Sequence, residues 1–355
     1  MKKLEYTVRF ITPAFLGNAE QAGQWRTPPF KALLRQWWRV AYAADNNFNV
    51  NIADMRQEEG RLFGHAWLEN DHDDLGNKVG GRKSRVRMRL DRWGIGKLTS
   101  WQGLPPVLHP EVHRAVGSDL YLGYGPLTLP RGERQPTLKA KAAIQAGESA
   151  RISLAIPDDH ESRIGYAVWL MRHYGALGGR SRNGWGSLSF EPENEDSRRA
   201  LEGHSAPLQD WTACLNTDWP CAIGQDRRPL IWQTQPFGDW KDLMKRLAEI
   251  KIGLRTQFTF PDVPPPHPRP LPRHWLSYPV TKHATLAWDA SARLPNTLRF
   301  NARPTIDGKV IGVVVHVPHL PPAAFQPDRR SIENVWQQVH AFLDADGRQL
   351  TRIPE

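Results

Sequence analysis

A regular succession of strand-like and helix-like patterns constrains the fold of this chain more than any other feature of its sequence. Alternating apolar and polar side chains predict half-buried strands, whereas apolar side chains at i, i+3, i+4 and i+7 predict amphipathic helices. The strands are expected at 4–11, 84–90, 149–156 and 188–190, a weaker one at 120–124, and the helices at 28–42 and 164–174. The resulting β-α-β-β-α-β order indicates an α+β fold for the first part of the chain.

The length of 355 residues predicts two domains, because a single hydrophobic core rarely grows that large. The order of elements in the first part is the ferredoxin-like order. A charged segment at 191–199 marks the boundary, so the expected domains are 1–200 and 201–355. The second domain is expected to hold helices starting after Asp239 and at Ser331, strands at 297–302 and 310–317, and a proline-rich loop at 261–272.

The charge balance and the cysteine content limit the class of protein. The 47 Lys and Arg residues outnumber 37 Asp and Glu residues, and there are 15 Trp, which suits phosphate binding and base stacking. The alternative is a GC-rich genome, which raises the Arg content without any function. No apolar run approaches about 18 residues and no signal-peptide core is present. Two cysteines without a paired CxxC favour a reducing cytoplasm and no structural zinc site.

Two basic stripes are candidates for RNA binding. Lys31, Arg35 and Arg39 recur at spacing four on the first helix, where a solvated helix face is the alternative. The strand at 84–90 is expected to turn its apolar residues to one face and its arginines to the other. Like charges on one strand face repel each other, and a polyanion would neutralise them. The candidates on and beside this strand are Arg82, Lys83, Arg85, Arg87 and Arg89.

The glycine-rich segment at 178–187 is the most informative stretch of the chain. Glycines let the backbone approach a ligand closely, and the side chains between them offer guanidinium forks, polar donors and an aromatic face. The segment follows a helix, whereas a phosphate-binding P-loop precedes one, so nucleotide hydrolysis is disfavoured. A tight turn with Trp185 in the core is the alternative. The candidate RNA-binding residues are Gly179, Arg180, Ser181, Arg182, Asn183 and Trp185.

Three ordered motifs resemble one CRISPR family. Residues 11–17, Ile-Thr-Pro-Ala-Phe-Leu-Gly, and residues 26–39, from Arg-Thr-Pro-Pro-Phe-Lys to Trp-Trp-Arg, resemble the opening of subunit one of the Cmr module, a RAMP protein of type III-B effector complexes. Residues 61–64, Arg-Leu-Phe-Gly, match that family's Leu-Phe-Gly element, and residues 178–187 resemble the RAMP glycine-rich loop. Ala32 stands where the family usually has Gly, a change that leaves the expected fold intact.

The resemblance implies tandem ferredoxin-like (RRM-like) RAMP domains with long loop insertions. It also implies a non-catalytic, cytoplasmic subunit of an antiviral ribonucleoprotein that lies near the 3′ end of the guide. The implied partners are crRNA, single-stranded target RNA and the other Cmr RAMP subunits, with no membrane, no metal and no cofactor. Base identity would be determined by guide–target pairing, so the protein itself would contact phosphates and shape.

Two other functions stay open on sequence grounds. One is a catalytic RAMP endoribonuclease, which needs a general base and a general acid around the 2′-hydroxyl. None of the candidate catalytic residues lies in a recognisable catalytic motif. They are His65, His109, His113, His173, Lys282, His283, Asp91 and Asp119. The other is a protein-only assembly module whose basic face meets an acidic partner.

Overall fold

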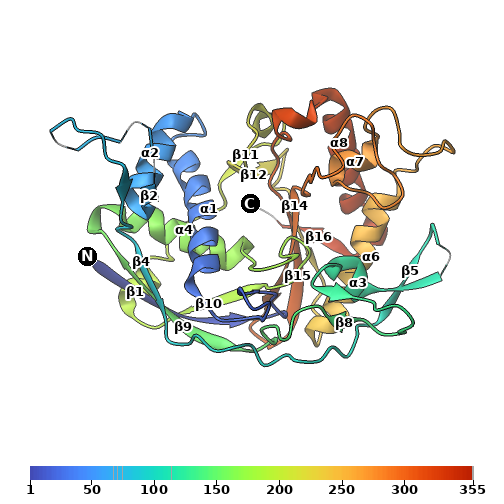
Figure 1. Ribbon diagram of the computed structural model, residues 1–355, viewed down its shortest axis with the longest axis horizontal. Coiled ribbons are helices and arrows are strands. Elements are labelled where there is room, and N and C mark those ends of the chain that lie inside the picture. The colour runs from blue at the N-terminus through green and yellow to red at the C-terminus, as the bar shows by residue number, and fades with distance from the viewer. Residues whose placement is uncertain (67, 70, 74, 113, 354–355) are drawn as a thin grey trace. The chain divides into compact units, whose positions relative to one another are not determined.

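The computed structural model describes residues 1–66, 68–69, 71–73, 75–112 and 114–353 and is a mixed helix-and-sheet structure (Figure 1). The chain divides into two compact units that are not consecutive in sequence. Unit 1 comprises residues 1–99, 140–179 and 186–207, and unit 2 comprises residues 100–139, 180–185 and 208–355. Two segments expected in the first domain, 100–139 and 180–185, therefore join the second unit.

Unit 1 is built on a four-stranded antiparallel sheet with the strand order β10-β1-β9-β4. Its strands are β1 (Lys2–Phe10), β4 (Arg87–Leu90), β9 (Ser149–Ile156) and β10 (Leu188–Pro192). Helix α1 (Thr27–Asp45) follows β1 and helix α4 (Glu161–Tyr174) follows β9, and the two helices pack on each other. The predicted β-α-β-β-α-β order is confirmed for this unit.

The apolar patterns of the sequence form the core of unit 1. Alternate residues of β1 are fully buried, and the side chains between them are half-buried or exposed. Phe10 on β1 packs against Phe30 on α1, with ring centroids 6.4 Å apart. Pro28 and Pro29 lie in the first turn of α1, where the missing N–H groups cost nothing. The predicted apolar stripe of α1 is buried throughout: Phe30, Leu33, Leu34, Trp37, Trp38, Ala41 and Tyr42.

Unit 2 is built on a second four-stranded antiparallel sheet with the strand order β14-β15-β13-β16. Its strands are β13 (Ile231–Thr234), β14 (Leu298–Pro304), β15 (Val310–His316) and β16 (Leu350–Arg352). Helix α6 (Trp240–Thr256) follows β13 and helix α8 (Arg329–Asp344) follows β15. The chain order is again β-α-β-β-α-β. If each unit numbers its own strands 1 to 4 along the chain, both sheets have the order 4-1-3-2.

Shorter elements fill the connections of both units. Unit 1 adds helices α2 (Ile52–Phe63) and α5 (Glu195–Arg199) and the strand pair β2 (His65–Ala66) and β3 (Gly81–Arg82). Unit 2 adds helices α3 (Ser118–Gly123) and α7 (Pro272–Leu276), with the pairs β5 (Pro106–His109) and β6 (Arg114–Gly117), β7 (Leu127–Thr128) and β8 (Thr137–Leu138), and β11 (Leu208–Asp210) and β12 (Ile223–Gln225). Single 3-10 turns lie at 158–160, 213–216, 323–325 and 346–348.

Two expectations about individual elements are wrong. The strand expected at 120–124 is largely helix α3, because the polar pair Ser118-Asp119 starts a helical turn in which Asp119 is buried. The final helix is capped by Asp328, which accepts the backbone N–H of Ser331, so Ser331 lies in the first turn. Among the described residues, no helix is long and apolar enough to cross a membrane.

Candidate nucleic-acid interface

The glycine-rich loop, residues 178–187, follows α4 and leads into β10. The φ values of Gly178, Gly184 and Gly186 are 96°, 90° and 67°. Residues other than glycine rarely adopt this region of backbone conformation. Arg180 also has a positive φ, 59°, and its side chain is exposed. Uncommon backbone conformations of this kind cluster at functional sites. The loop therefore has a sharply turned backbone that holds one arginine at the surface.

The middle of the loop adds to the edge of the sheet of unit 2. The backbone N–H of Phe300 on β14 donates to the carbonyl of Arg182 at 3.1 Å, and Asn183 forms a β-bridge with Phe300. The Arg182 guanidinium donates to the carbonyl of Asn296 at 2.8 Å. These contacts explain why 180–185 belongs to unit 2.

Asn183 holds the loop in place from within unit 2. Its side chain is 8% exposed, and its Nδ2 donates to the carbonyl of Leu122 on α3 at 2.7 Å. Its Oδ1 accepts a hydrogen bond from Nζ of Lys251 on α6 at 2.6 Å. A lysine that the sequence did not single out is thereby drawn to the glycine-rich loop.

Five basic residues of unit 2 form the cationic cluster, which is defined as Arg180, Arg182, Lys251, Arg255 and Arg299. Arg180 and Arg255 act electrostatically on Lys251, and Arg182 acts on Arg299. Arg180 donates through Nε to the carbonyl of Tyr124 at 2.6 Å, and Arg255 donates to Oγ of Ser277 at 2.5 Å. Arg182 and Lys251 likewise donate to neutral oxygens. Hydrogen bonds to neutral oxygens hold these side chains in place without cancelling a positive charge.

Burial and the repulsion of neighbouring positive charges lower the pKa values of Arg299 and Lys251 in the cationic cluster. Burial, followed by the charge of Arg182, lowers the pKa of Arg299 to about 9, although an arginine ordinarily stays charged at any pH below about 12. Burial lowers the pKa of Lys251 well below its usual range, and the charges of Arg255 and Arg180 add to that effect. A bound phosphate would relieve this repulsion and accept charge-assisted hydrogen bonds.

The remaining residues of the glycine-rich loop have structural contacts. The backbone N–H of Gly179 donates to the carbonyl of Phe15 at 3.0 Å, and Ser181 is half-buried. Trp185 is fully buried and packs edge-on against Trp101, with ring centroids 5.6 Å apart. The expectation that Trp185 offers a ring to an RNA base is not supported, because a fully buried ring has no face open to a base. The core position kept open as the alternative is the one observed.

The basic stripe of α1 binds groups of the protein itself. Arg35 and Arg39 both bind the carboxylate of Glu59 on α2, whose side chain is 4% exposed, with N–O distances of 2.8 and 2.9 Å. Lys31 donates to the carbonyl of Phe63 at 2.9 Å. Their geometry is that of a clamp between α1 and α2, and it does not present a row of cations to a ligand.

Arg82 also binds a buried carboxylate, that of Asp71. Asp71 is fully buried and accepts from Arg82, from His65 at 2.7 Å and from Arg61 at 3.4 Å. These bonds, that of Arg82 first, hold the pKa of Asp71 well below its usual range. They tie the β2–β3 hairpin to α2, whereas the neighbouring Lys83 is exposed.

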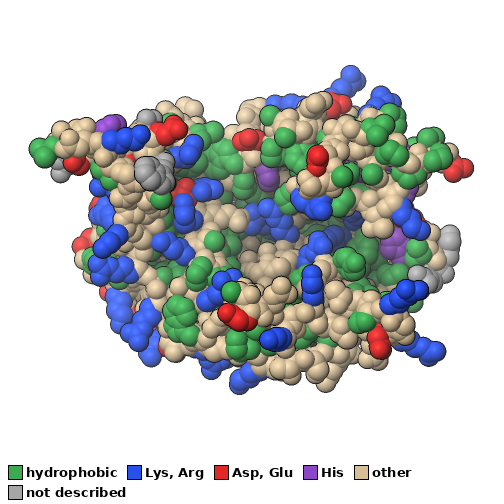
Figure 2. Space-filling model, viewed as in Figure 1, with side chains coloured by type: hydrophobic (Ala, Val, Ile, Leu, Met, Phe, Trp, Pro, Cys, Tyr) green, Lys and Arg blue, Asp and Glu red, His purple; other side chains and the backbone are tan. Residues whose placement is uncertain are grey.

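The strand β4 shows the predicted alternation. Val86 and Leu90 are buried, whereas Arg85, Arg87 and Arg89 are exposed. Arg85 forms a weak ion pair with Asp159, at 3.4 Å between two exposed side chains. β4 is an edge strand, and basic side chains gather over the part of unit 1 where β4 and β9 lie (Figure 2). This arginine row is a second basic surface of the molecule.

Sequence reasoning missed three members of the cationic cluster. Lys251 and Arg255 lie one turn apart near the C-terminal end of α6, where basic residues ordinarily interact with the helix dipole. Arg299 gave a local signal, since an arginine inside a strand expected to be apolar requires a buried partner or a ligand. No pattern in the sequence connected these three residues to a loop more than 60 positions away.

The histidines proposed for catalysis have structural partners. His173 contacts the carbonyl of Trp169 at 2.8 Å, and His283 shares a hydrogen bond with His267 at 3.1 Å. His113 lies outside the described residues, and His109 packs against Tyr121. Among the described residues, no group of three or more His, Cys, Asp or Glu side chains could hold a metal ion.

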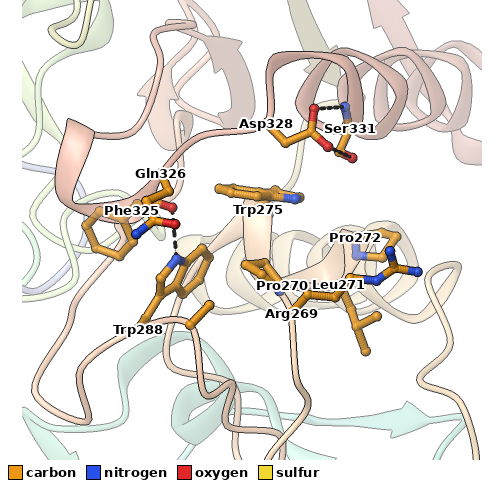
Figure 3. A pocket seen from close by; sticks show the side chains of 11 residues that line it. Arg269, Pro270, Leu271, Pro272, Trp275, Trp288, Phe325, Gln326, Asp328 and Ser331 are labelled. Carbon is orange, nitrogen blue, oxygen red and sulfur yellow. Dashed lines mark hydrogen bonds between the residues drawn. The ribbon is translucent and has the colours of Figure 1, made fainter.

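Unit 2 also contains an aromatic pocket of about 420 Å³ (Figure 3). Trp275, Trp288 and Phe325 line it, and Nε1 of Trp288 donates to the carbonyl of Phe325 at 2.9 Å. The carboxylate of Asp328 lies in the same wall and accepts from the backbone and the hydroxyl of Ser331. A carboxylate in the lining makes this pocket a poor site for a phosphate.

The comparisons with known proteins give structural neighbours but no sequence relatives. No protein-family model and no curated protein sequence matches the chain. The apo crystal structure of Cmr1 from Pyrococcus furiosus aligns with 99% of this chain and 98% of its own, at 16% identity and a TM-score of 0.46. A chain from the cryo-EM structure of the type III-B Cmr-beta complex bound to cognate target RNA aligns with 95% of this chain and 99% of its own, at 10% identity and a TM-score of 0.49.

Proposed function

We propose that this chain is a non-catalytic RNA-binding subunit of a type III-B CRISPR effector complex. In this proposal it lies at the 3′ end of the guide and contacts single-stranded target RNA, the crRNA and the neighbouring RAMP subunits. The motifs at 11–17, 26–39, 61–64 and 178–187 support the family assignment. The RNA-binding surface is the cationic cluster of unit 2, with the arginine row of β4 as a second surface.

The topology of both units supports tandem ferredoxin-like domains. Each unit has the chain order β-α-β-β-α-β and an antiparallel sheet with the strand order 4-1-3-2. That chain order defines the ferredoxin-like fold. Helices α6 and α8 connect the strands of unit 2 as α1 and α4 connect those of unit 1. We therefore assign one such domain to each unit, with the segment 100–139 as a long insertion packed on the second.

The cationic cluster is the observation that carries the RNA-binding proposal. Crowding of like charges around a turned, glycine-rich backbone is costly for a protein alone and favourable once a phosphate backbone is bound. The neutral partners of Arg180 and Arg182 fix the geometry of these side chains and leave their charge available. Contacts of this kind bind RNA without reading its sequence, and guide–target pairing would supply the specificity.

A binding experiment with the purified chain tests the proposal against both alternatives. We expect a labelled single-stranded RNA of about 20 nucleotides to bind the protein in a gel-shift assay. We also expect the RNA to stay uncleaved at the same protein concentration, both with and without Mg²⁺. Absence of binding, with capture of an acidic polypeptide such as polyglutamate in its place, would support the protein-only assembly module. Discrete RNA products that disappear in the His109→Ala variant would support the endoribonuclease.

A further inference from the structure

Lys251 has an unusual position for a lysine on a helix. Its Nζ donates to Oδ1 of Asn183, inside the contact between α6 and the glycine-rich loop, instead of extending into water. Asn183 is itself buried and fixed by Leu122. Lys251 is half-buried, and its terminal nitrogen is held by a neutral acceptor.

The charges that face Lys251 are positive on both packed elements. Arg255 lies one turn further along α6, and Arg180 faces it from the glycine-rich loop. The carboxylate of Glu111 also acts on Arg255, and it is engaged in a bidentate ion pair with Arg273. The phenol of Tyr121 also faces Arg255 and is neutral because burial raises its pKa.

These surroundings disfavour the protonated form of Lys251 in the unliganded protein. Burial is the largest cause of its lowered pKa, and the repulsion from Arg255 and Arg180 is the next. The arginines have a higher intrinsic pKa, and even Arg299, whose pKa burial lowers to about 9, stays mostly protonated at neutral pH. Lysine is thus the member of the cationic cluster whose charge can respond to a ligand.

We propose that binding of an RNA phosphate in the cationic cluster is accompanied by the uptake of one proton at Nζ of Lys251. The inference rests on the proposed function, RNA binding at this cluster. The neutral amine takes its proton from the buffer and becomes an ammonium that can bond the phosphate oxygen. The bound phosphate offsets the repulsion from Arg255 and Arg180, so the pKa of Lys251 rises when the ligand is present.

The direction of the pH dependence follows from linkage. Between the pKa of Lys251 in the unliganded protein and its higher pKa in the complex, each binding event consumes a proton. Affinity therefore falls as pH rises through this window, by at most about tenfold for each pH unit. A fixed-charge cluster would show no such slope. His319 also lies beside Arg182 and Arg299, and because burial lowers its pKa to about 4, it would take up protons in more acidic solution only.

Isothermal titration calorimetry measures the proton directly and needs no variant. The probe is a single-stranded oligouridylate, titrated into the full chain in two buffers of different ionisation enthalpy at the same neutral pH, where Arg299 stays mostly protonated. For the uptake of one proton, we expect the two apparent binding enthalpies to differ by the difference between the ionisation enthalpies of the two buffers, with the more positive value in the buffer of higher ionisation enthalpy. Binding with equal enthalpies overturns the coupling and leaves the RNA-binding function standing. Failure to bind overturns both.

Two substitutions assign the proton to Lys251. Lys251→Arg carries a permanent charge, so it is expected to bind without proton uptake and with the pH slope removed. Lys251→Met has no titratable group at that position. Its RNA affinity is therefore expected to equal that of the wild type at high pH, and to lack the increase that the wild type shows as pH falls. Unchanged proton uptake in both variants would assign the proton to another group and overturn the proposal. Near-ultraviolet circular dichroism checks that both variants retain the native fold.

Discussion

Oδ1 of Asn183 in the glycine-rich loop accepts a hydrogen bond from Nζ of Lys251 on α6 at 2.6 Å, across 68 positions of sequence. This bond joins the most recognisable motif of the chain to a helix of the second unit that carries no motif. It brings Arg180 and Arg182 of the loop into the same cluster as Arg255 of the helix. The function proposed for the molecule depends on that combination and not on the loop alone.

The loop arginines are expected to contribute more to RNA binding than the basic stripe of α1. The double substitution Arg180→Ala and Arg182→Ala removes two phosphate-binding groups, so affinity falls and the salt slope becomes shallower by about 0.7 for each lost contact. Lys31→Ala, which removes a hydrogen bond to the carbonyl of Phe63, is expected to change RNA affinity little. Fluorescence anisotropy with labelled single-stranded RNA measures both quantities.

Arg330→Ala is the matched control for charge, because Arg330 is an exposed arginine of unit 2 on α8. It lowers the net charge of the protein as each loop substitution does, but it lies outside the cationic cluster. Equal losses of affinity in Arg330→Ala and in the single loop variants would mean that net charge alone determines binding. That result would contradict a defined site.

Gly184 is expected to tolerate no side chain. Its φ is 90°, and an added Cβ would lie 3.0 Å from Sδ of Met244 and 3.1 Å from Cδ1 of Leu247 on α6. Gly184→Ala combines backbone strain with overpacking, so we expect a loss of about 2 kcal/mol in the free energy of unfolding. Gly308→Ala measures the contribution of backbone strain alone, because Gly308 also has a positive φ, 78°, but an added Cβ there would meet no neighbouring atom. Urea denaturation of both variants measures the difference, and equal losses would show that the packing against α6 contributes nothing.

Glu59 is expected to be a structural residue. Its buried carboxylate joins Arg35 and Arg39 of α1 to α2, and Glu59→Gln would leave two guanidiniums with a weaker acceptor. Because both arginines are partly solvated, the expected loss is about 1–3 kcal/mol in the free energy of unfolding. RNA affinity of the folded variant is expected to stay unchanged. A large loss of RNA binding with unaltered stability would restore the α1 stripe as an RNA-binding surface.

Asp71 is expected to govern part of the acid sensitivity of unit 1. Hydrogen bonds from Arg82, and then from His65 and Arg61, hold the pKa of its carboxyl below the ordinary value of 3.8. A carboxyl with a depressed pKa stabilises the fold above its unfolded-state pKa, and this contribution is lost as pH falls through the folded-state value. Asp71→Asn is expected to lower the thermal midpoint at neutral pH and to reduce its fall in acid. Parallel pH profiles for both proteins would contradict this assignment.

The sequence predicted the elements of the first unit because its patterns are local. The apolar stripe of α1 and the alternation of β1 and β9 each fall within one element, and burial follows them closely. The strand expected at 120–124 failed because a short apolar stretch fits a strand or a helix equally well. The second sheet was only partly expected, since β13 and β16 are short and give weak patterns.

The candidate site was less predictable than the fold because charge pairing is a long-range property. Nothing in the local sequence distinguishes Arg35, Arg39 and Arg82 from Arg87 and Arg89. Yet the structure pairs Arg35, Arg39 and Arg82 with buried carboxylates at least 11 positions away in sequence. Lys251 and Arg299 join the site only through tertiary contacts with the loop. Periodicity indicates which face of an element is polar, and it does not indicate whether that polar face meets solvent, a carboxylate or a ligand.

The salt dependence of RNA binding tests the central claim most directly. Affinity of the full-length chain for a single-stranded RNA, measured by anisotropy from low to moderate salt, reports the number of phosphates that the protein neutralises. Several phosphate contacts at the cationic cluster and the arginine row predict a linear fall of log affinity with log salt, with a slope of about −0.7 for each contact. A flat line, or no binding at low salt, would contradict the claim that this chain binds RNA through its basic surfaces.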